Sequence, residues 1–457
     1  MTTKPTDAGL SLRRVLDFKD TLALAFGAMV GWSWVILSGM WLGNGGSLGA
    51  ALGFVVAGVP IMLIGLLYAE LASAMPVVGG EHAYSLRALG RHWSFICTWS
   101  IVFVYVSVCA FEAVALPTVL DYWFPNYQTG YLWTIAGWDV HASWAAVGVA
   151  GTVLICFVNY IGVKSSAIVQ TTVTMLVLAA GLMLLSGALF EGSSANMEPL
   201  FVDGWKGVIA VAVMAPFMFV GFDVIPQAAQ EIQLPARSIG RVLVGSIATA
   251  LAWYCLVILA VSALLVSSQI NSTGLITAEA SSAAWGPIGG NLLVLGGVGG
   301  IITSWNAFVV GGSRAVYAMA NDGMLPAWLG RLHPKYRTPS NAILAIGLLS
   351  AAAPFFGRKF LVWIVDSGSF AVVIAYILVA ISFLRLRKKE PGMERPFRLR
   401  YGIPIGWLAL LGSTGLLILY LPGSPSALAW PVEWAIVLLW FIIGGLFYLP
   451  RSRHTQL

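Results

Sequence analysis

The chain has 457 residues, of which 59% are hydrophobic and only 10% are charged. Its mean hydropathy is +0.86, whereas ordinary soluble domains carry about 25% charged residues. This composition excludes a string of soluble domains and predicts a single membrane domain that occupies residues 1–457.

Apolar segments of membrane-spanning length follow one another along the whole chain. A spanning helix needs about 20 predominantly apolar residues. Residues 1–17 lack the apolar core and the cleavage site of a signal peptide. The sequence therefore predicts an all-α integral membrane protein with twelve transmembrane helices, at residues 18–43, 49–75, 93–124, 142–160, 166–189, 206–231, 239–267, 287–320, 341–357, 361–386, 403–421 and 431–449.

Lys and Arg are unevenly distributed between the two sets of loops. With both termini in the cytoplasm, 22 of the 25 basic residues lie inside, and only Lys206, Arg358 and Lys359 lie outside. Cytoplasmic loops of membrane proteins carry an excess of Lys and Arg. The pattern predicts a multi-pass protein of the plasma membrane (in a bacterium, the inner membrane) with cytoplasmic termini. The net charge of +6 thus reflects topology, and we expect the lipid bilayer, not a nucleic acid, as its partner.

Two predicted helices are interrupted. The first contains FGAMVGWSWVILSG (26–39), with three glycines, and the sixth contains APFMFVGFDVIPQAAQEI (215–232), with two prolines and a glycine. Glycine and proline weaken a helix, and unwound backbone in a membrane must line a cavity or be buried in protein. The alternative is that these residues only allow close packing or kinks.

Interrupted helices five spans apart are typical of transporters built from inverted repeats. We therefore expect residues 18–189 and 206–386 to form two repeats of opposite topology, followed by two additional helices at 403–449. In this arrangement the two breaks face each other near the middle of the membrane.

Two longer motifs resemble a known family. YAELASAMPVVGGEHAYSLRALG (68–90) resembles the end of helix 2 and the following loop of the amino acid–polyamine–organocation (APC) transporter superfamily. GSRAVYAMANDGMLPAWLGRLHPKYRTPSNAI (312–343) is similar to that family's helix 8–9 segment, and GFD and AAQEI in helix 6 also fit. The resemblance spans essentially the whole chain. It implies the leucine-transporter fold with a 5+5 inverted repeat, and alternating access around a site at mid-membrane.

The resemblance also implies a substrate site at the two breaks. The tripeptide whose backbone amides hold an amino acid's carboxylate in relatives matches residues 31–33, but Trp32 replaces a small residue there. Phe217 matches an aromatic gate, and Phe308 a pocket-facing aromatic of helix 8. The expected substrate-binding residues are Gly31, Trp32, Ser33, Trp34, Glu112, Phe217, Gly221, Phe222, Asp223, Trp305 and Phe308.

Glu112 and Asp223 are acids within predicted spans. An ionised acid at the centre of a membrane costs about 2.5–3.5 kcal/mol on insertion scales, so it usually pairs, is protonated or serves a pathway. For Glu112 the structural alternative is a protonated side chain that is hydrogen-bonded to a neighbouring helix. For Asp223 it is an anion that caps the positive end of the broken sixth helix.

The coupling ion is left open by the sequence. Several proton-coupled relatives have a lysine within helix 5, but here Lys164 lies at the loop and the inner position is apolar, around Val177. Thr303 and Ser304 are candidate sodium ligands, although such hydroxyls often bond a backbone carbonyl. A proton, sodium, exchange and the membrane potential remain alternatives, and no cofactor is expected.

These observations predict a secondary active transporter for a small amino acid or organic amine. The two acids and the altered first break favour a cationic amine, such as a polyamine or ethanolamine, over a zwitterionic amino acid. A membrane-embedded enzyme would need a cluster of catalytic side chains, and the five histidines and four cysteines are scattered. We therefore expect no enzyme; a channel is the third class, separable by saturable exchange.

Overall fold

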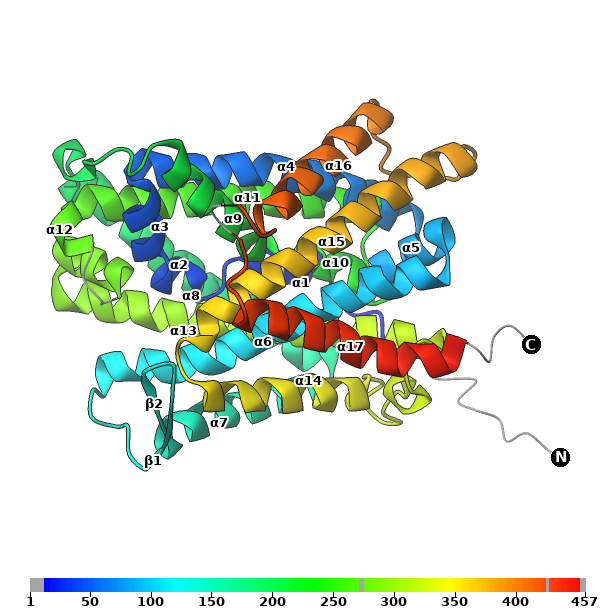
Figure 1. Ribbon diagram of the computed structural model, residues 1–457, viewed down its shortest axis with the longest axis horizontal. Coiled ribbons are helices and arrows are strands. Elements are labelled where there is room, and N and C mark those ends of the chain that lie inside the picture. Colours follow the sequence, from blue (N-terminus) through cyan, green and yellow to red (C-terminus); the bar gives the residue numbers. More distant parts are fainter. Residues whose placement is uncertain (1–11, 271–274, 425–426, 453–457) are drawn as a thin grey trace.

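A computed structural model describes residues 12–270, 275–424 and 427–452. Long helices lie side by side in one bundle (Figure 1). In the described residues the single sheet is a two-stranded antiparallel hairpin of β1 (Tyr131–Ile135) and β2 (Trp138–His141). The protein is therefore an all-α membrane protein, as predicted.

The helices of the first half run from the first break to the end of the fifth span. They are α1 (Phe18–Met29), α2 (Ser33–Ile36), α3 (Ser38–Gly45), α4 (Ser47–Ala74), α5 (Glu81–Leu89), α6 (Arg91–Trp123), α7 (Ala142–Ile161) and α8 (Val163–Glu191), followed by the 3₁₀ turn η1 (Ser194–Met197).

The second half begins with the other broken helix. It consists of α9 (Trp205–Phe219), α10 (Val224–Gln227), η2 (Ala229–Glu231), α11 (Ala236–Leu264), α12 (Ser267–Ile270), α13 (Ile276–Asn321), η3 (Ala327–Gly330), α14 (Ser340–Ala352), η4 (Ala353–Phe356), α15 (Phe360–Lys389), α16 (Gly402–Leu419) and α17 (Val432–Ser452).

The number of spans is ten or eleven by length and composition in the described residues. Ten helical segments are long and apolar enough to cross a membrane, and the bent pair at residues 18–36 and 38–45 adds one. The predicted span at 341–357 is a shorter apolar helix, Ser340–Phe356, whose last turn is 3₁₀. Twelve transmembrane helices therefore remain a prediction, although a helical segment lies at every predicted position.

Local sequence explains why the first helix begins at residue 18 and ends at residue 29. The Asp17 carboxylate accepts from the Asp20 amide at 2.9 Å, and Asp20 reciprocates, so a capping box starts α1. The last helical hydrogen bond of α1 is donated by the Val30 amide, and the amides of residues 31–33 make none. The helix resumes as α2, and the chain then bends by 67° into α3. The first predicted break is thus confirmed as a structural feature.

The second break lies directly against the first. Between α9 and α10, Gly221 has a φ of +133°, which an L-amino acid with a side chain rarely adopts. A Cβ on Gly221 would lie 2.7 Å from the Cβ of Ala28 and 2.9 Å from the Met29 nitrogen. Glycine is therefore needed both for the backbone conformation and for the close approach of the two breaks.

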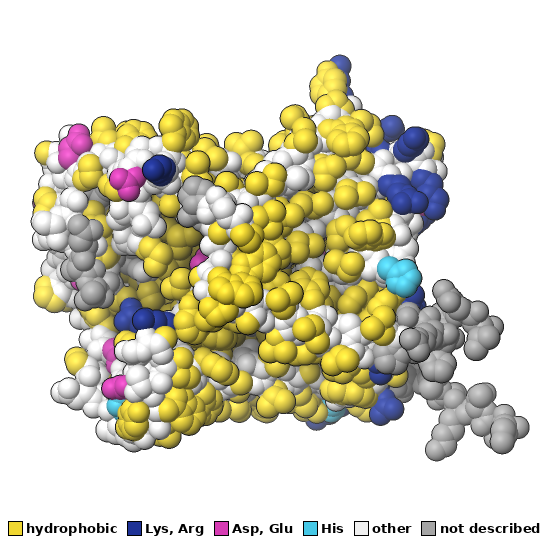
Figure 2. Space-filling view, viewed as in Figure 1, with side chains coloured by type: hydrophobic (Ala, Val, Ile, Leu, Met, Phe, Trp, Pro, Cys, Tyr) yellow, Lys and Arg dark blue, Asp and Glu magenta, His cyan; other side chains and the backbone are white. Residues whose placement is uncertain are grey.

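Basic side chains are concentrated at one end of the bundle. On the face shown, Lys and Arg concentrate where α15 and α16 are connected, at the end opposite to the β hairpin (Figures 1 and 2). Glu70 at the end of α4 is fully buried there and pairs with Arg387 and, at 3.1 Å, with Arg395. This ion cluster fastens the α15–α16 connection to the end of α4.

Two single cysteines test the predicted orientation. Gly392, in the basic α15–α16 connection, is exposed, and a Cβ there meets nothing within 4 Å. Asn126, just after α6, is exposed towards the other end. In intact cells an impermeant thiol reagent should label Asn126→Cys and not Gly392→Cys, and the native cysteines are at most half-exposed. The reverse pattern would place both termini outside.

Candidate substrate site

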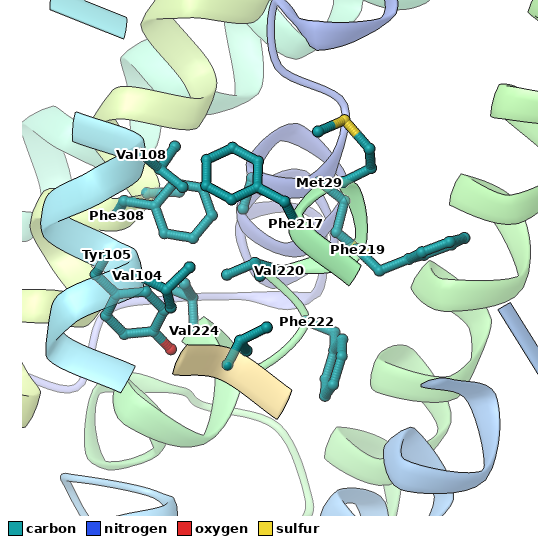
Figure 3. Packing of buried hydrophobic residues seen from close by; sticks show 14 of the residues in the cluster. Met29, Val104, Tyr105, Val108, Phe217, Phe219, Val220, Phe222, Val224 and Phe308 are labelled. Carbon is teal, nitrogen blue, oxygen red and sulfur yellow. The ribbon is translucent and has the colours of Figure 1, made fainter. Parts of the chain in front are cut away.

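A small cavity lies between the two breaks. Its volume is about 20 Å³, which is room for about one water molecule and far below the roughly 300–1,000 Å³ of typical ligand pockets. Figure 3 shows the rings of Phe217 and Phe308 beside Val108 and Met29 at this place. Its lining residues come from both breaks, α6 and α13: Ala28, Met29, Gly31, Ser33, Val108, Phe111, Glu112, Phe217, Met218, Val220, Ser304 and Phe308.

Six predicted residues line this cavity. They are Gly31, Ser33, Glu112, Phe217 and Phe308, together with Ser304, which was a candidate sodium ligand. The interrupted helices pointed to the first break, and the family resemblance placed Glu112, Phe217 and Phe308 beside it.

Glu112 of α6 lies against the first break. A Cβ on Gly31 would be 2.9 Å from the nearer Glu112 carboxylate oxygen and 2.8 Å from the Cβ of Ser304. Only a glycine at this position lets α6 and α13 approach the break so closely. The Glu112 side chain is 1% exposed, so the protein must satisfy its polar atoms.

The two oxygens of Glu112 have different surroundings. The carboxylate accepts from the backbone amide of Trp32 and the hydroxyl of Ser304. Its Oε2 atom has no hydrogen-bond partner, although it is buried. An unsatisfied carboxylate oxygen in a cavity is a candidate acceptor for a ligand's donor.

The amides of the first break are only partly used. Within the part of the chain that the structure describes, no backbone carbonyl accepts from the amides of Gly31, Trp32 or Ser33. Trp32 donates to Glu112. The Gly31 and Ser33 amides therefore remain available at the edge of the cavity.

Tyr254 of α11 joins the two breaks, a role that no local sequence pattern indicates. Its hydroxyl lies 2.6 Å from the Met29 carbonyl oxygen in the first break and 3.4 Å from the Met218 carbonyl oxygen near the second. The Ser33 hydroxyl lies 3.1 Å from the Tyr254 hydroxyl oxygen. A tyrosine in an apolar helix resembles any interior aromatic, and only the fold shows that it serves two breaks.

Three predicted tryptophans lie near the site but do not line the cavity. The Trp32 ring lies over Gly297 of α13, where a Cβ would be 2.0 Å from it. Trp34 packs edge-on against Trp253, with ring centroids 5.4 Å apart. Trp305 packs against Gly151 of α7. Their rings support the walls of the site from behind.

Three predicted residues of helix 6 lie within the second break, between α9 and α10, and do not line the cavity. Gly221 forms the break, and its amide donates to the Asp223 carboxylate at 3.0 Å. Phe222 stacks on Tyr376, and its ring packs edge-on against Tyr68. Asp223 is fully buried and is absent from the cavity lining. It accepts from the Gly221 amide of its own break, but its side chain makes no capping hydrogen bond to α10, so the expected cap is not formed.

The proposed sodium ligands have different surroundings. The Thr303 hydroxyl donates to the Gly300 carbonyl at 3.1 Å within its own helix, whereas Ser304 faces Glu112. Polar groups of α8 instead approach α1: the Gln170 amide donates to the Ala23 carbonyl at 3.1 Å. A second bond joins Gln170 to Asn306 of α13 at 2.8 Å. A neutral amide thus connects α1, α8 and α13, and sequence reasoning missed it.

The sequence model of the family described as amino acid permease matches residues 16–449 of the chain. The chain therefore belongs to the amino acid permease family, and it is a transporter and not an enzyme. This confirms the predicted resemblance to the APC superfamily.

Three relatives are similar over nearly the whole chain. The methylthioribose transporter of Bacillus subtilis is 25% identical over 98% of this chain and 95% of its own length. The branched-chain amino acid permease of the same organism is 26% identical, with 99% and 96% covered. The vacuolar cationic amino acid transporter 8 of Arabidopsis thaliana is 26% identical, with 97% and 74% covered. Because their substrates differ chemically, these likenesses support transport without fixing a substrate.

Replacing Phe217 tests whether its ring contacts the ligand. A ring against a cationic ligand contributes about 0.5–2 kcal/mol, so Phe217→Ala should weaken binding about 2- to 30-fold. Affinity for the best ligand is measured on purified protein. Phe190→Ala, in which the lost ring is 75% exposed on the outer surface, is the matched control. Unchanged affinity in a folded Phe217 variant would remove this ring from the site.

Replacing Tyr254 tests the link between the breaks. Tyr254→Phe keeps the ring and leaves the Met29 carbonyl and the Ser33 hydroxyl without this partner, which should cost about 1–3 kcal/mol of stability. Thermal unfolding of the purified protein measures this loss. Tyr401→Phe, at a 62% exposed tyrosine, should unfold like the parent. Equal stability of all three proteins would mean that the breaks do not depend on this hydroxyl.

Proposed function

We propose that the protein is a secondary active transporter that carries a small organic amine across the cell membrane by alternating access. The ammonium group binds Glu112. The observation that carries this proposal is the buried, unpaired Oε2 atom of Glu112 in the lining of the cavity between the breaks. An ammonium donor there would satisfy the oxygen and offset the cost of burying the charge.

The other contacts of Glu112 favour a substrate without a carboxylate. Glu112 already accepts from the Trp32 amide, one of the donors that the first break offers to an anion. A substrate carboxylate at the same place would meet a like charge across a short distance, and such a pair is destabilising in a dry site. An amine such as ethanolamine or a short polyamine avoids this repulsion.

The apolar walls of the cavity suit an organic cation. The rings of Phe111, Phe217 and Phe308 all line it, and Phe111 and Phe217 have centroids 6.0 Å apart. A cation over an aromatic face gains about 0.5–2 kcal/mol, with the upper end when it is desolvated. With a volume of about 20 Å³, the cavity has to widen before an organic cation can enter.

A zwitterionic amino acid is the second candidate. The Gly31 and Ser33 amides have no backbone partner and could hold a carboxylate while Glu112 binds the amino group. The name of the branched-chain amino acid permease agrees with a substrate of this kind. Leucine and putrescine therefore distinguish the two candidates.

The proposal includes the arrangement of the protein in the membrane. Residues 18–189 and 206–386 form the two inverted repeats, residues 403–449 add two helices, and both termini lie in the cytoplasm. The facing breaks, one in α1–α2 and one in α9–α10, support the two repeats. The basic end of the bundle supports the orientation.

A ligand panel tests the substrate class. Purified protein is heated with putrescine, ethanolamine, leucine or arginine, and any stabilising compound is then tested for saturable exchange in proteoliposomes. Stabilisation and exchange with the amines, and not with leucine, are expected. Exchange of leucine alone would favour the second candidate, and a flux that does not saturate would indicate a channel.

The charge of Glu112 is tested by Glu112→Gln. This variant keeps the shape and removes the charge, and a charge-assisted hydrogen bond is worth about 1.5–3 kcal/mol. Affinity for the best amine should therefore fall about 10- to 150-fold, measured by calorimetry. Glu191→Gln, at an exposed glutamate, is the control and should bind like the parent. Equal affinity in an equally stable Glu112 variant would remove Glu112 from the site.

A further inference from the structure

A second pair of buried acids lies outside the substrate cavity. Glu81 begins α5, Asp223 directly precedes α10, and both side chains are fully buried. Asp223 lies one turn before Gln227, whose backbone amide donates to the Asp223 carbonyl at 3.4 Å. Gln227 of α10 reaches across and donates to Glu81 Oε1 at 2.5 Å. The pair thus joins the loop after α4 to the helix after the second break.

Each acid keeps an unsatisfied oxygen. Glu81 Oε2, Asp223 Oδ2 and Gln227 Oε1 have no partner at hydrogen-bond distance, and the Tyr105 hydroxyl interacts with the Asp223 carboxylate at longer range. The hydroxyls of Tyr68, Tyr84 and Tyr376 are also buried and unpaired. Buried polar atoms are rarely left without partners, and here two carboxylates, an amide and three tyrosine hydroxyls lack them in one place.

No basic side chain compensates the two acids. Among the described residues, neither Glu81 nor Asp223 takes part in an ion pair with Lys, Arg or His. Other buried acids do: Glu231 pairs with Arg314 at 2.8 Å. Two carboxylates in a dry site without a cation cannot both be ionised, so at least one of them holds a proton.

The remaining titratable neighbours do not change this balance. The side chains that face the pair are Tyr68 of α4, Tyr84 of α5, Cys97 and Tyr105 of α6 and Tyr376 of α15. Tyrosine and cysteine are neutral at pH 7 in their ordinary state. They therefore supply no positive charge to either acid.

His82, the next residue of α5, is engaged elsewhere. Its Nε2 atom lies 2.7 Å from Asp322, whose carboxylate is half-exposed in a surface groove. The hydrogen bond from His82 holds the pKa of Asp322 below its usual range. His82 thus forms its hydrogen bond with a surface acid and not with Glu81.

We propose that Glu81 and Asp223 form a shared proton-binding site that keeps the cytoplasmic side of the transporter closed, and that release of the proton opens it. The bound proton neutralises one of the two carboxylates. When it leaves for cytoplasmic water, two carboxylate anions face each other across the contact between α5 and α10. This inference rests on the transporter role and does not depend on which substrate is carried.

The contact that the two anions would open is tight. Gly80, with a φ of +41°, lies so close to α10 that a Cβ there would be 2.9 Å from the Pro226 Cβ. Immediately after α10, the amides of Val15 and Leu16 both donate to the Glu231 carbonyl at 2.8 Å. Repulsion between Glu81 and Asp223 acts directly on this contact between α5 and α10.

The buried thiol of Cys97 is a native reporter of opening. Cys97 is fully buried on α6 and interacts electrostatically with Glu81. The parent for the test carries Cys109→Ala, Cys156→Ala and Cys255→Ala. The rate at which a small impermeant thiol reagent modifies Cys97 is measured in inside-out vesicles from acidic to alkaline pH. No substrate is needed, so the result is independent of the ligand panel and of Glu112.

Neutral variants separate opening from the ordinary ionisation of the thiol. Glu81→Gln and Asp223→Asn in this parent cannot develop the second negative charge, so the rise of their labelling with pH reports the thiol alone. The parent should show an additional rise of at least about tenfold, equivalent to about 1.4 kcal/mol. Glu191→Gln in the same parent should behave like it. Thermal unfolding of each protein verifies that it is folded.

Two results would overturn the proposal. One is the same pH dependence of labelling in the parent and in both neutral variants. The other is a Cys97 that stays unlabelled in the parent at every pH. If one neutral variant fails to fold, the other still decides between these outcomes, because loss of either charge removes the repulsion.

Discussion

A helix that breaks inside a membrane leaves amides and carbonyls that lipid cannot satisfy, and the site is arranged around this constraint. The Tyr254 hydroxyl serves carbonyls of both breaks. Glu112 takes the Trp32 amide, and Asp223 takes the Gly221 amide. The atoms left over, the amides of Gly31 and Ser33 and one oxygen of Glu112, surround the small cavity.

Five of the six buried acids in the described residues fall into two groups by their partners, and the sixth, Glu433, accepts from the Ala429 amide. Glu70 and Glu231 are paired with arginines and hold elements together at the basic end of the bundle. Glu81, Glu112 and Asp223 lack a basic partner in the described residues and keep an unsatisfied oxygen each. Burying such groups costs free energy, so the second group identifies the places where a cation or a proton is expected to bind.

Much of the fold was predictable because its signals are local. Apolar runs placed the spans, and glycine and proline placed both breaks. The exception in length is α14, where the hydropathy of 353–356 extends a short helix that in fact ends in a 3₁₀ turn. The lining residues Glu112, Phe217 and Phe308 followed from their depth in the membrane and from the family resemblance.

The rest of the site depends on contacts between segments far apart in the sequence. Tyr254 and Gln170 have no local feature that separates them from other interior residues. The direction of a ring next to a break depends on which helix offers space, and no sequence period records this. Trp32 and Trp34 were therefore predicted near the substrate, but their rings pack outside the cavity lining.

The position of Trp32 has a consequence for how relatives should vary. Its ring fills the space that a side chain at residue 297 would need. One turn later, a Cβ on Gly300 would lie 2.5 Å from the Gly31 carbonyl oxygen. The volumes at positions 32 and 297 are therefore complementary. A permease with a small residue in its first break has room for a larger one on the facing helix, and the two positions should change together.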